Sequence, residues 1–179
     1  MQRTSEILTI TEKQGKVGPM VFVTVRHAIT SPQGLAVEED QDIVYLPMPE
    51  SYAAPPPDPL PEDLGWKEAR PVDPVLLFRF SALTFNGHRI HYDLRYATEA
   101  ERYPGLVVHG PLQAVLLMES AKRHLPGAVP ATYTFRAARP IFDFDPCTVA
   151  GRQAPDGGSD LFTANGTDDI AMRAHVTWR

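Results

Sequence analysis

The sequence is poor in the residues that would assign it to several common protein classes. It has a single cysteine, Cys147, which excludes an internal disulfide and a cysteine-only zinc site and suits a reducing compartment. No apolar run approaches the roughly 18 residues that cross a membrane. Thr4, Ser5 and Glu6 interrupt the first residues before the apolar run of a signal peptide builds up. We therefore expect a cytoplasmic protein without a membrane partner.

Positive charge is also scarce. The 179 residues include 17 Lys and Arg against 22 Asp and Glu, which gives a formal net charge of −5. Non-specific nucleic-acid binding needs a basic face, so we expect no nucleic-acid partner, although a few local arginines suffice for an anionic small ligand. Apolar residues make up 43% and charged residues 22% of the chain, which is ordinary for a globular protein.

Proline divides the chain into unlike parts. Residues 47–74 hold nine of the 18 prolines, a composition typical of an extended linker. The residues before it predict only β-strands, over 6–10, 20–25 and 35–46. A three-stranded sheet whose apolar face is uncovered is a poor independent domain. We expect the rest of the chain, or another chain, to cover it.

The remainder of the chain, 75–179, predicts a different architecture. We expect a strand over 75–85, irregular helix over 88–103, a long helix from about 111 to 125, and strands over 131–138, 147–152, 160–164 and 170–178. The long helix is apolar nearly all round, which predicts that it is buried. A sheet wrapped round one buried helix satisfies this order, so the predicted class is α+β.

Histidines are crowded just before the long helix. His88 and His91 fall within four residues, and His109 precedes Gly110 and Pro111 at the head of the helix. A histidine titrates near neutral pH, and a helix N-terminus presents free N–H groups. Together they can move a proton beside a developing oxyanion. The pattern therefore predicts an enzyme that acts on a thioester-like carbonyl.

Two motifs carry a family resemblance: Phe85-Asn-Gly-His-Arg-Ile-His-Tyr-Asp93 and Leu106-Val-Val-His-Gly-Pro-Leu112. They resemble the MaoC-type hydratases and dehydratases of the hotdog fold. Within that family they are most similar to the branch with mesaconyl-C4-CoA (3-methylfumaryl-CoA) hydratase and type 2 3-hydroxyacyl-thioester dehydratase. The resemblance implies a complete hotdog domain over 75–179 and a partial N-terminal hotdog, its closing strands only, over 1–46.

The resemblance implies a hydro-lyase that adds or removes water at the α,β double bond of an acyl thioester. Coenzyme A would enter as part of the substrate, with no other cofactor. The family motif has an aspartate five positions before its histidine, and Asn86 stands there in this chain. We assign His91 to the proton transfers, Asn86 to holding the water and the N–H of Gly110 to the oxyanion.

Four neighbours are assigned to substrate binding: His88, Arg89, His109 and Pro111. Arg89 would contact a carboxylate on the acyl chain. Structural alternatives stay open: a solvated arginine at 89, a loop support at 88, a brace for the helix at 109, and a hydrogen-bonded core histidine at 91. The pattern His-x-x-His-x-Asp also suggests a metal site, but residues two apart diverge on a helix, so we expect no metal.

Other charged residues have simpler interpretations. Asp93 and Arg95 predict a local polar pair, and Glu119 predicts a satisfied structural carboxylate on the long helix. Arg136 and Arg139 follow on a later strand, where they either meet the phosphates of coenzyme A or lie in solvent.

Two further functions stay open. A hotdog thioesterase would use the same oxyanion site with an aspartate or glutamate to direct water, but no acid is placed as well as His91. A non-catalytic acyl-binding or scaffold subunit would follow from the incomplete N-terminal half. The exposed edges of a single hotdog also predict self-association, and we expect a homodimer.

Overall fold

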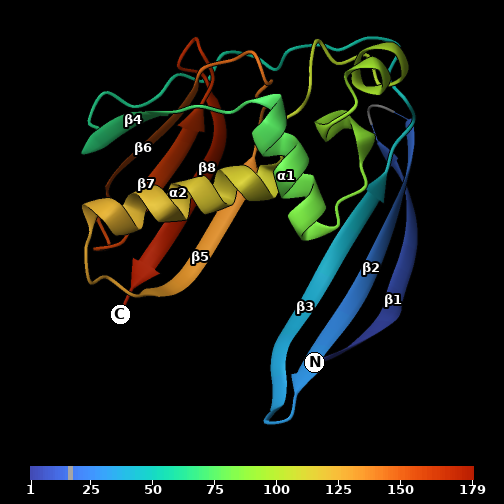
Figure 1. Ribbon diagram of the computed structural model, residues 1–179, viewed down its shortest axis with the longest axis horizontal. Helices are drawn as coiled ribbons and strands as arrows, with labels where there is room; N and C mark the ends of the chain where they lie inside the picture. The colour runs from blue at the N-terminus through green and yellow to red at the C-terminus, as the bar shows by residue number, and fades with distance from the viewer. Residues whose placement is uncertain (16–17) are drawn as a thin grey trace. The chain divides into compact units, whose positions relative to one another are not determined.

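The computed structural model describes residues 1–15 and 18–179, which form two compact units, Met1–Pro49 and Glu50–Arg179 (Figure 1). The first unit is an antiparallel sheet in the order β1-β2-β3, made of β1 (Gln2–Gly15), β2 (Gly18–Ser31) and β3 (Gly34–Tyr45). These strands are longer than the expected ones. Apolar side chains of this unit stay open, and Ile7 and Ile10 are 60% and 65% exposed. The sheet therefore builds no closed core of its own.

The second unit is a five-stranded antiparallel sheet with a long helix, α2 (Gly110–His124), across one face (Figure 1). The strand order is β4-β6-β7-β8-β5. The strands are β4 (Trp66–Arg70), β5 (Pro130–Ala137), β6 (Cys147–Gln153), β7 (Ser159–Ala164) and β8 (Ile170–Trp178). The predictions of the long helix and of the last four strands are confirmed, with small shifts at their ends.

Alternation along β8 builds the core against α2. Met172 and Val176 point toward the helix, where they join a buried cluster with Leu117 and Ala121. Complete burial of one such leucine stabilises the fold by about 1.5–3 kcal/mol. The far side of α2 stays open, with Val115 55% exposed. The expectation that α2 is buried all round is wrong, because the second unit has a single sheet and covers only one side of the helix.

Residues 74–84 form a helix, where a strand was expected over 75–85. The helix α1 (Pro74–Thr84) begins at Asp73, whose carboxylate accepts the N–H of Leu76 at 2.7 Å. An unbroken apolar run is compatible with a buried strand or a helix. The capping Asp73 followed by a proline was the local sign of a helix start.

The segment after α1 is irregular, as expected. The 3₁₀ turn η1 (Arg89–His91) and the π-helical turn η2 (Tyr96–Ala100) follow one another before the chain reaches α2. Their short lengths fit a segment that is fixed by packing and side-chain contacts more than by helix propensity.

Part of the predicted linker belongs to the second unit. Residues 66–70 form β4, which pairs antiparallel with β6 at the edge of the sheet, although 47–74 was expected to be an extended linker. The indole N–H of Trp66 donates to Ser120 Oγ on α2 at 3.1 Å. The division between the two units falls after Pro49. Trp66 is one of the contacts that hold this segment on the second unit.

We expect the substitution Gly151→Ala to lower the free energy of unfolding by about 1–3 kcal/mol, the usual cost of overpacking. A Cβ at residue 151 would lie 2.2 Å from the ring of Trp66, so β4 and β6 would have to separate. Urea unfolding measures the loss. Gly87→Ala is the matched control, since nothing lies within 4 Å of its Cβ position. Equal stabilities of the two variants would contradict the packing of β4 on β6.

Within residues 1–15 and 18–179, no helix is long and apolar enough to cross a membrane.

Candidate active site

His91 is buried at the end of η1, with 8% of its surface exposed. Its Nδ1 lies 2.7 Å from the carbonyl oxygen of Val107. Because a carbonyl only accepts, Nδ1 carries the proton, and the neutral ring presents its lone pair at Nε2. No partner for Nε2 is found among the described residues. The ring is therefore oriented as a proton acceptor.

Backbone pairing fixes the carbonyl that orients this ring. The N–H of Val107 donates to the oxygen of Ile90 at 3.0 Å, and the N–H of Val108 donates to Ile141 at 2.8 Å. Val107 also forms an isolated antiparallel bridge with Phe142. Residues 106–108 are thus held between η1 and the segment before β6. Because the ring of His91 bonds to Val107, this backbone pairing determines the orientation of the ring.

A second imidazole stacks on the first. The rings of His91 and His109 are nearly parallel, with centroids 3.7 Å apart and an angle of 18°. His109 is fully buried, and its Nε2 lies 2.8 Å from Ser81 Oγ on α1. Its Nδ1 has no partner within the described part of the chain. Sequence reasoning placed a strand at 75–85 and so missed Ser81.

Burial keeps both histidines neutral. Desolvation, and to a smaller extent the neighbouring His91, lower the pKa of His109 to about 4. Desolvation also lowers the pKa of His91 below 6.5, against the opposing hydrogen bond to Val107, while His88 adds to the lowering. Two stacked imidazolium cations would repel one another, so the neutral pair is the stable form near neutral pH.

His109 makes the stability of the fold depend on pH. Its pKa is about 4 in the folded chain against 6.5 when unperturbed, so the unfolded chain binds more protons between these values. The stability that comes from neutral His109 is complete above pH 6.5 and is lost as the pH falls toward 4. We expect a loss of about 1.4 kcal/mol per pH unit, or about 3 kcal/mol in all.

Urea unfolding at about pH 7 and about pH 4.5 tests this dependence in the wild type and in His109→Gln. The comparison of the two chains cancels the carboxylates that titrate in both. We expect the wild type to lose about 2–3 kcal/mol more than the variant. Parallel pH dependences would show that His109 is not held neutral by the fold.

The N-terminus of α2 opens beside these rings. His109 is the N-cap residue and makes no side-chain cap bond, and Pro111 has no N–H to donate. The N–H of Gly110 is one of the groups that a helix leaves without an internal partner. A Cβ at Gly110 would meet only Met172 Cε, at 3.9 Å. Packing among the described residues therefore does not require a glycine here.

Asn86 stands in a tight turn and lines an apolar cavity. Its Oδ1 accepts the N–H of His88 at 3.0 Å. The cavity has a volume of about 320 Å³ and is lined by Asn86, Ser81, Phe78 and Tyr92 among others. The side chain thus both fixes the turn and faces a space large enough for a short acyl chain. Its role toward water stays a prediction.

His88 and Arg89 are engaged with carboxylates of the chain. His88 Nε2 lies 2.9 Å from Glu101, and its ring stands at 82° to that of His91. The guanidinium of Arg89 is 2.6 Å from Asp93 and lies over the ring of Tyr96. Binding of a substrate carboxylate by Arg89 would require it to leave Asp93.

Asp93 and Arg95 have other partners than expected, whereas Glu119 is a paired carboxylate, as expected. The predicted pair of Asp93 with Arg95 is wrong, because Asp93 binds Arg89 and Arg95 binds Glu99. Glu119 lies on the open side of α2 and pairs with Arg123 at 3.3 Å.

The side chain of Arg139 is 8% exposed and donates to the carbonyls of Pro55 and Pro56, so it holds the proline-rich segment. No group of three or more His, Cys, Asp or Glu side chains in residues 1–15 and 18–179 is arranged to hold a metal ion.

The sequence matches the family model for hydroxyacyl-thioester dehydratase type 2 over residues 1–143. It is 47% identical over 172 residues to mesaconyl-C(4)-CoA hydratase of Chloroflexus aurantiacus, a match that covers 89% of this chain and 61% of the relative. It is 31% identical to the mitochondrial hydroxyacyl-thioester dehydratase type 2 of Schizosaccharomyces pombe, over 86% of this chain and 50% of the relative. The chain therefore spans between half and about three fifths of the length of these relatives.

Solved structures agree on the fold. A MaoC-like dehydratase from Phytophthora capsici matches 99% of this chain and 64% of its own, with a TM-score of 0.70 and 11% identity. The (R)-hydratase of A. caviae matches 64% of this chain and 93% of its own, with a TM-score of 0.54 and 20% identity. The fold is a MaoC-like hotdog, and the chain belongs to the hydroxyacyl-thioester dehydratase type 2 family.

Proposed function

We propose that this chain adds water to, or removes it from, the α,β double bond of an acyl-coenzyme A thioester. The observation that carries the proposal is the orientation of His91. Its Nδ1–H donates to the carbonyl of Val107, and its Nε2 has no partner in residues 1–15 and 18–179. Its ring is stacked on His109, which precedes the first residue of α2. This stacking supports a site in which His91 is the proton acceptor and the N–H of Gly110 is the oxyanion donor.

In the hydration direction, Nε2 of His91 takes a proton from water as the water oxygen bonds to the β-carbon. The electron pair of the double bond moves toward the thioester carbonyl. The N–H of Gly110 and the positive end of the α2 dipole stabilise the developing enolate oxygen. The imidazolium then returns its proton to the α-carbon, the carbonyl reforms, and His91 is neutral again. Dehydration follows the same steps in reverse.

The similar proteins support this substrate class. One relative is named for the hydration of mesaconyl-C(4)-CoA and another for the dehydration of a hydroxyacyl thioester. The apolar cavity beside Asn86 suits a short acyl chain, and its lining residues include no cation. An unsubstituted acyl chain therefore fits this cavity without the loss of the Arg89–Asp93 ion pair.

Crotonyl-CoA and mesaconyl-C4-CoA separate the competing activities. The intact chain is mixed with each substrate while enoyl absorbance and free thiol are followed together. Loss of absorbance without thiol release identifies the hydratase. Thiol release would identify a thioesterase, and the absence of both signals would leave a non-catalytic acyl-binding subunit.

We also propose that the active form is a homodimer. The open apolar side chains of β1 and the open side of α2 both favour association with a second copy. Sedimentation velocity measures the mass, and a monomer that is fully active would contradict this proposal.

A further inference from the structure

A second hollow lies on the face of the five-stranded sheet that is turned away from α2. Met172 and Val176 on β8 pack toward α2, so the alternating residues Arg173 and His175 point to the opposite face. They line a hollow of about 380 Å³ together with side chains from β5, β6 and β7. None of its lining residues belongs to the candidate active site.

Two arginines face each other across this hollow. Arg136 on β5 is directly opposite Arg173 on β8, and both line the hollow. Like charges directly opposite on neighbouring strands destabilise a sheet. Arg173 is compensated by Asp58 at 2.6 Å. Arg136 has no ion pair within the described residues, so its charge is available to a ligand.

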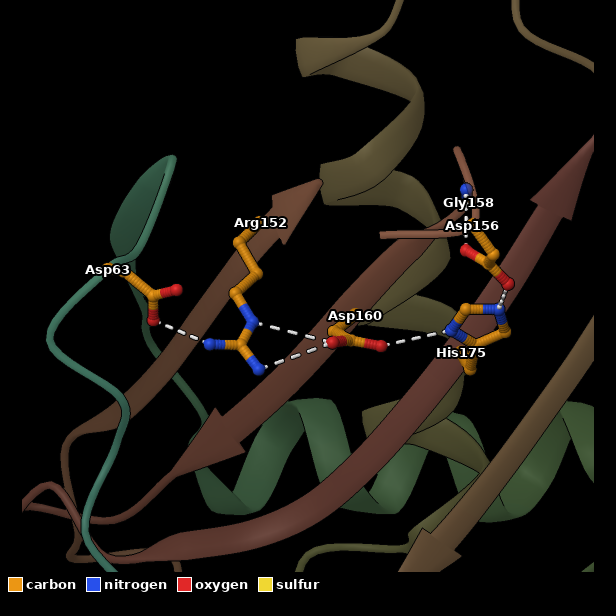
Figure 2. A network of polar contacts seen from close by, with 6 residues as sticks. All are labelled: Asp63, Arg152, Asp156, Gly158, Asp160 and His175. Carbon is orange, nitrogen blue, oxygen red and sulfur yellow. Dashed lines mark hydrogen bonds and ion pairs between the residues drawn. The ribbon is translucent and has the colours of Figure 1, made fainter. Parts of the chain in front are cut away.

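A third guanidinium stands at the side of the hollow. Arg152 on β6 bonds to Asp63 and to Asp160 (Figure 2). The guanidinium carbons of Arg152 and Arg173 lie 5.8 Å and 5.7 Å from the ring centroid of Phe162. That ring is buried, and cation–π attraction holds both cations over it. The floor of the hollow thus keeps the guanidinium groups together.

The acidic side chains of the hollow are already engaged. Nδ1 of His175 lies 2.9 Å from Asp160 and its Nε2 lies 3.1 Å from Asp156, as Figure 2 shows. Asp156 also accepts the N–H of Gly158. Asp156 and Asp160 are therefore engaged by His175, Gly158 and Arg152. Arg136 is left as the arginine of the hollow that has no ion pair among the described residues.

We infer that this hollow binds a phosphate-bearing anion between Arg136 and Arg173, with Arg152 at the third side. Guanidinium groups match the oxygens of a phosphate with two parallel hydrogen bonds. Two ion pairs must loosen. Asp63, the partner of Arg152, is 72% exposed, and Arg173 and Asp58 are 49% and 42% exposed, and exposed pairs contribute little. The phosphate belongs either to coenzyme A or to a separate phosphorylated ligand.

Inorganic pyrophosphate is the probe that tests the site. Calorimetric titration of the intact chain in phosphate-free buffer at low salt is expected to show binding. Arg136→Ala and Arg173→Ala should each weaken it at least tenfold, and Arg136→Gln, which keeps part of the stem, should weaken it as well. Arg95→Ala is the matched control, since Arg95 is an exposed arginine of the same unit that pairs with Glu99.

The outcomes are distinct. Absence of pyrophosphate binding to the wild type, or an equal loss in Arg95→Ala, would overturn the inference. Titration with free coenzyme A then identifies the source of the phosphate. Competition between coenzyme A and pyrophosphate assigns the hollow to coenzyme A, and a lack of competition assigns it to a separate phosphorylated ligand. His91→Asn should bind pyrophosphate like the wild type, so a failure of the proposed reaction would leave this result intact.

Discussion

Replacement of His91 by asparagine is expected to lower kcat for crotonyl-CoA hydration by about 10²–10⁴-fold, the usual contribution of a general acid–base. The asparagine amide can still donate to the carbonyl of Val107, as Nδ1 of the histidine does. It has no basic nitrogen in the place of Nε2. The fold therefore keeps its local hydrogen bond while the proton acceptor is removed. Loss of enoyl absorbance measures the rate.

His124→Asn is the matched control for this substitution. His124 lies at the other end of α2, where its ring stacks on Trp66 and its Nδ1 bonds to the carbonyl of Ser120. We expect its kcat to stay within about threefold of the wild type. An active His91→Asn enzyme would mean that another group takes the proton from water.

The pH profile of the wild type gives an independent test of His91. Its pKa is lowered below 6.5 by burial, so the neutral, basic form persists below that pH. We expect kcat/KM to be level from neutral pH downward and to fall only on the acid side of 6.5, where His91 takes up a proton. A decline that begins well above that value would point to a different base.

Replacement of Gly110 by proline is expected to lower kcat by about 10²–10³-fold, the cost of one lost oxyanion donor. Proline is well tolerated at the first position of a helix, but it has no N–H. The backbone of His109, with φ −57° and ψ 135°, already has the extended conformation that a following proline requires. The variant should therefore fold, and loss of enoyl absorbance under saturating substrate measures kcat.

Gly110→Ala separates the lost N–H from the added side chain. Alanine keeps the donor, and its Cβ would make only an ordinary contact with Met172. We expect a loss of less than about tenfold for alanine, well below the loss for proline. Equal losses in the two variants would show that bulk at this position, and not the hydrogen bond, limits the reaction.

The sequence predicted those parts of the fold whose signal is local. A long apolar segment with a proline in its first turn located α2, and alternating residues located β8. A helical pattern depends on residues three to four positions apart, and a strand pattern on residues two apart. Both can be recognised without knowing which element packs against them. The run over 75–85 carried no clear period, and only the cap at Asp73 distinguished the helix from a strand.

The candidate site was predictable as a list of residues but not as a geometry. The sequence and its family resemblance selected His91, His109 and Gly110. They did not indicate that the two rings stack at 3.7 Å, or that Ser81 on α1 bonds to His109. These contacts join residues that lie 18 and 28 positions apart, so only the packed chain decides them.

The sequence by itself determined the net charge of the protein and excluded internal disulfides, since a formal charge of −5 and a single cysteine do not depend on folding. Tertiary structure decided which charges are free. It paired Arg89 with Asp93, buried Arg139 against the proline-rich segment and set Arg136 opposite Arg173. The free energy of a charge depends on the partners and the solvent that surround it, and packing brings those partners from distant parts of the chain.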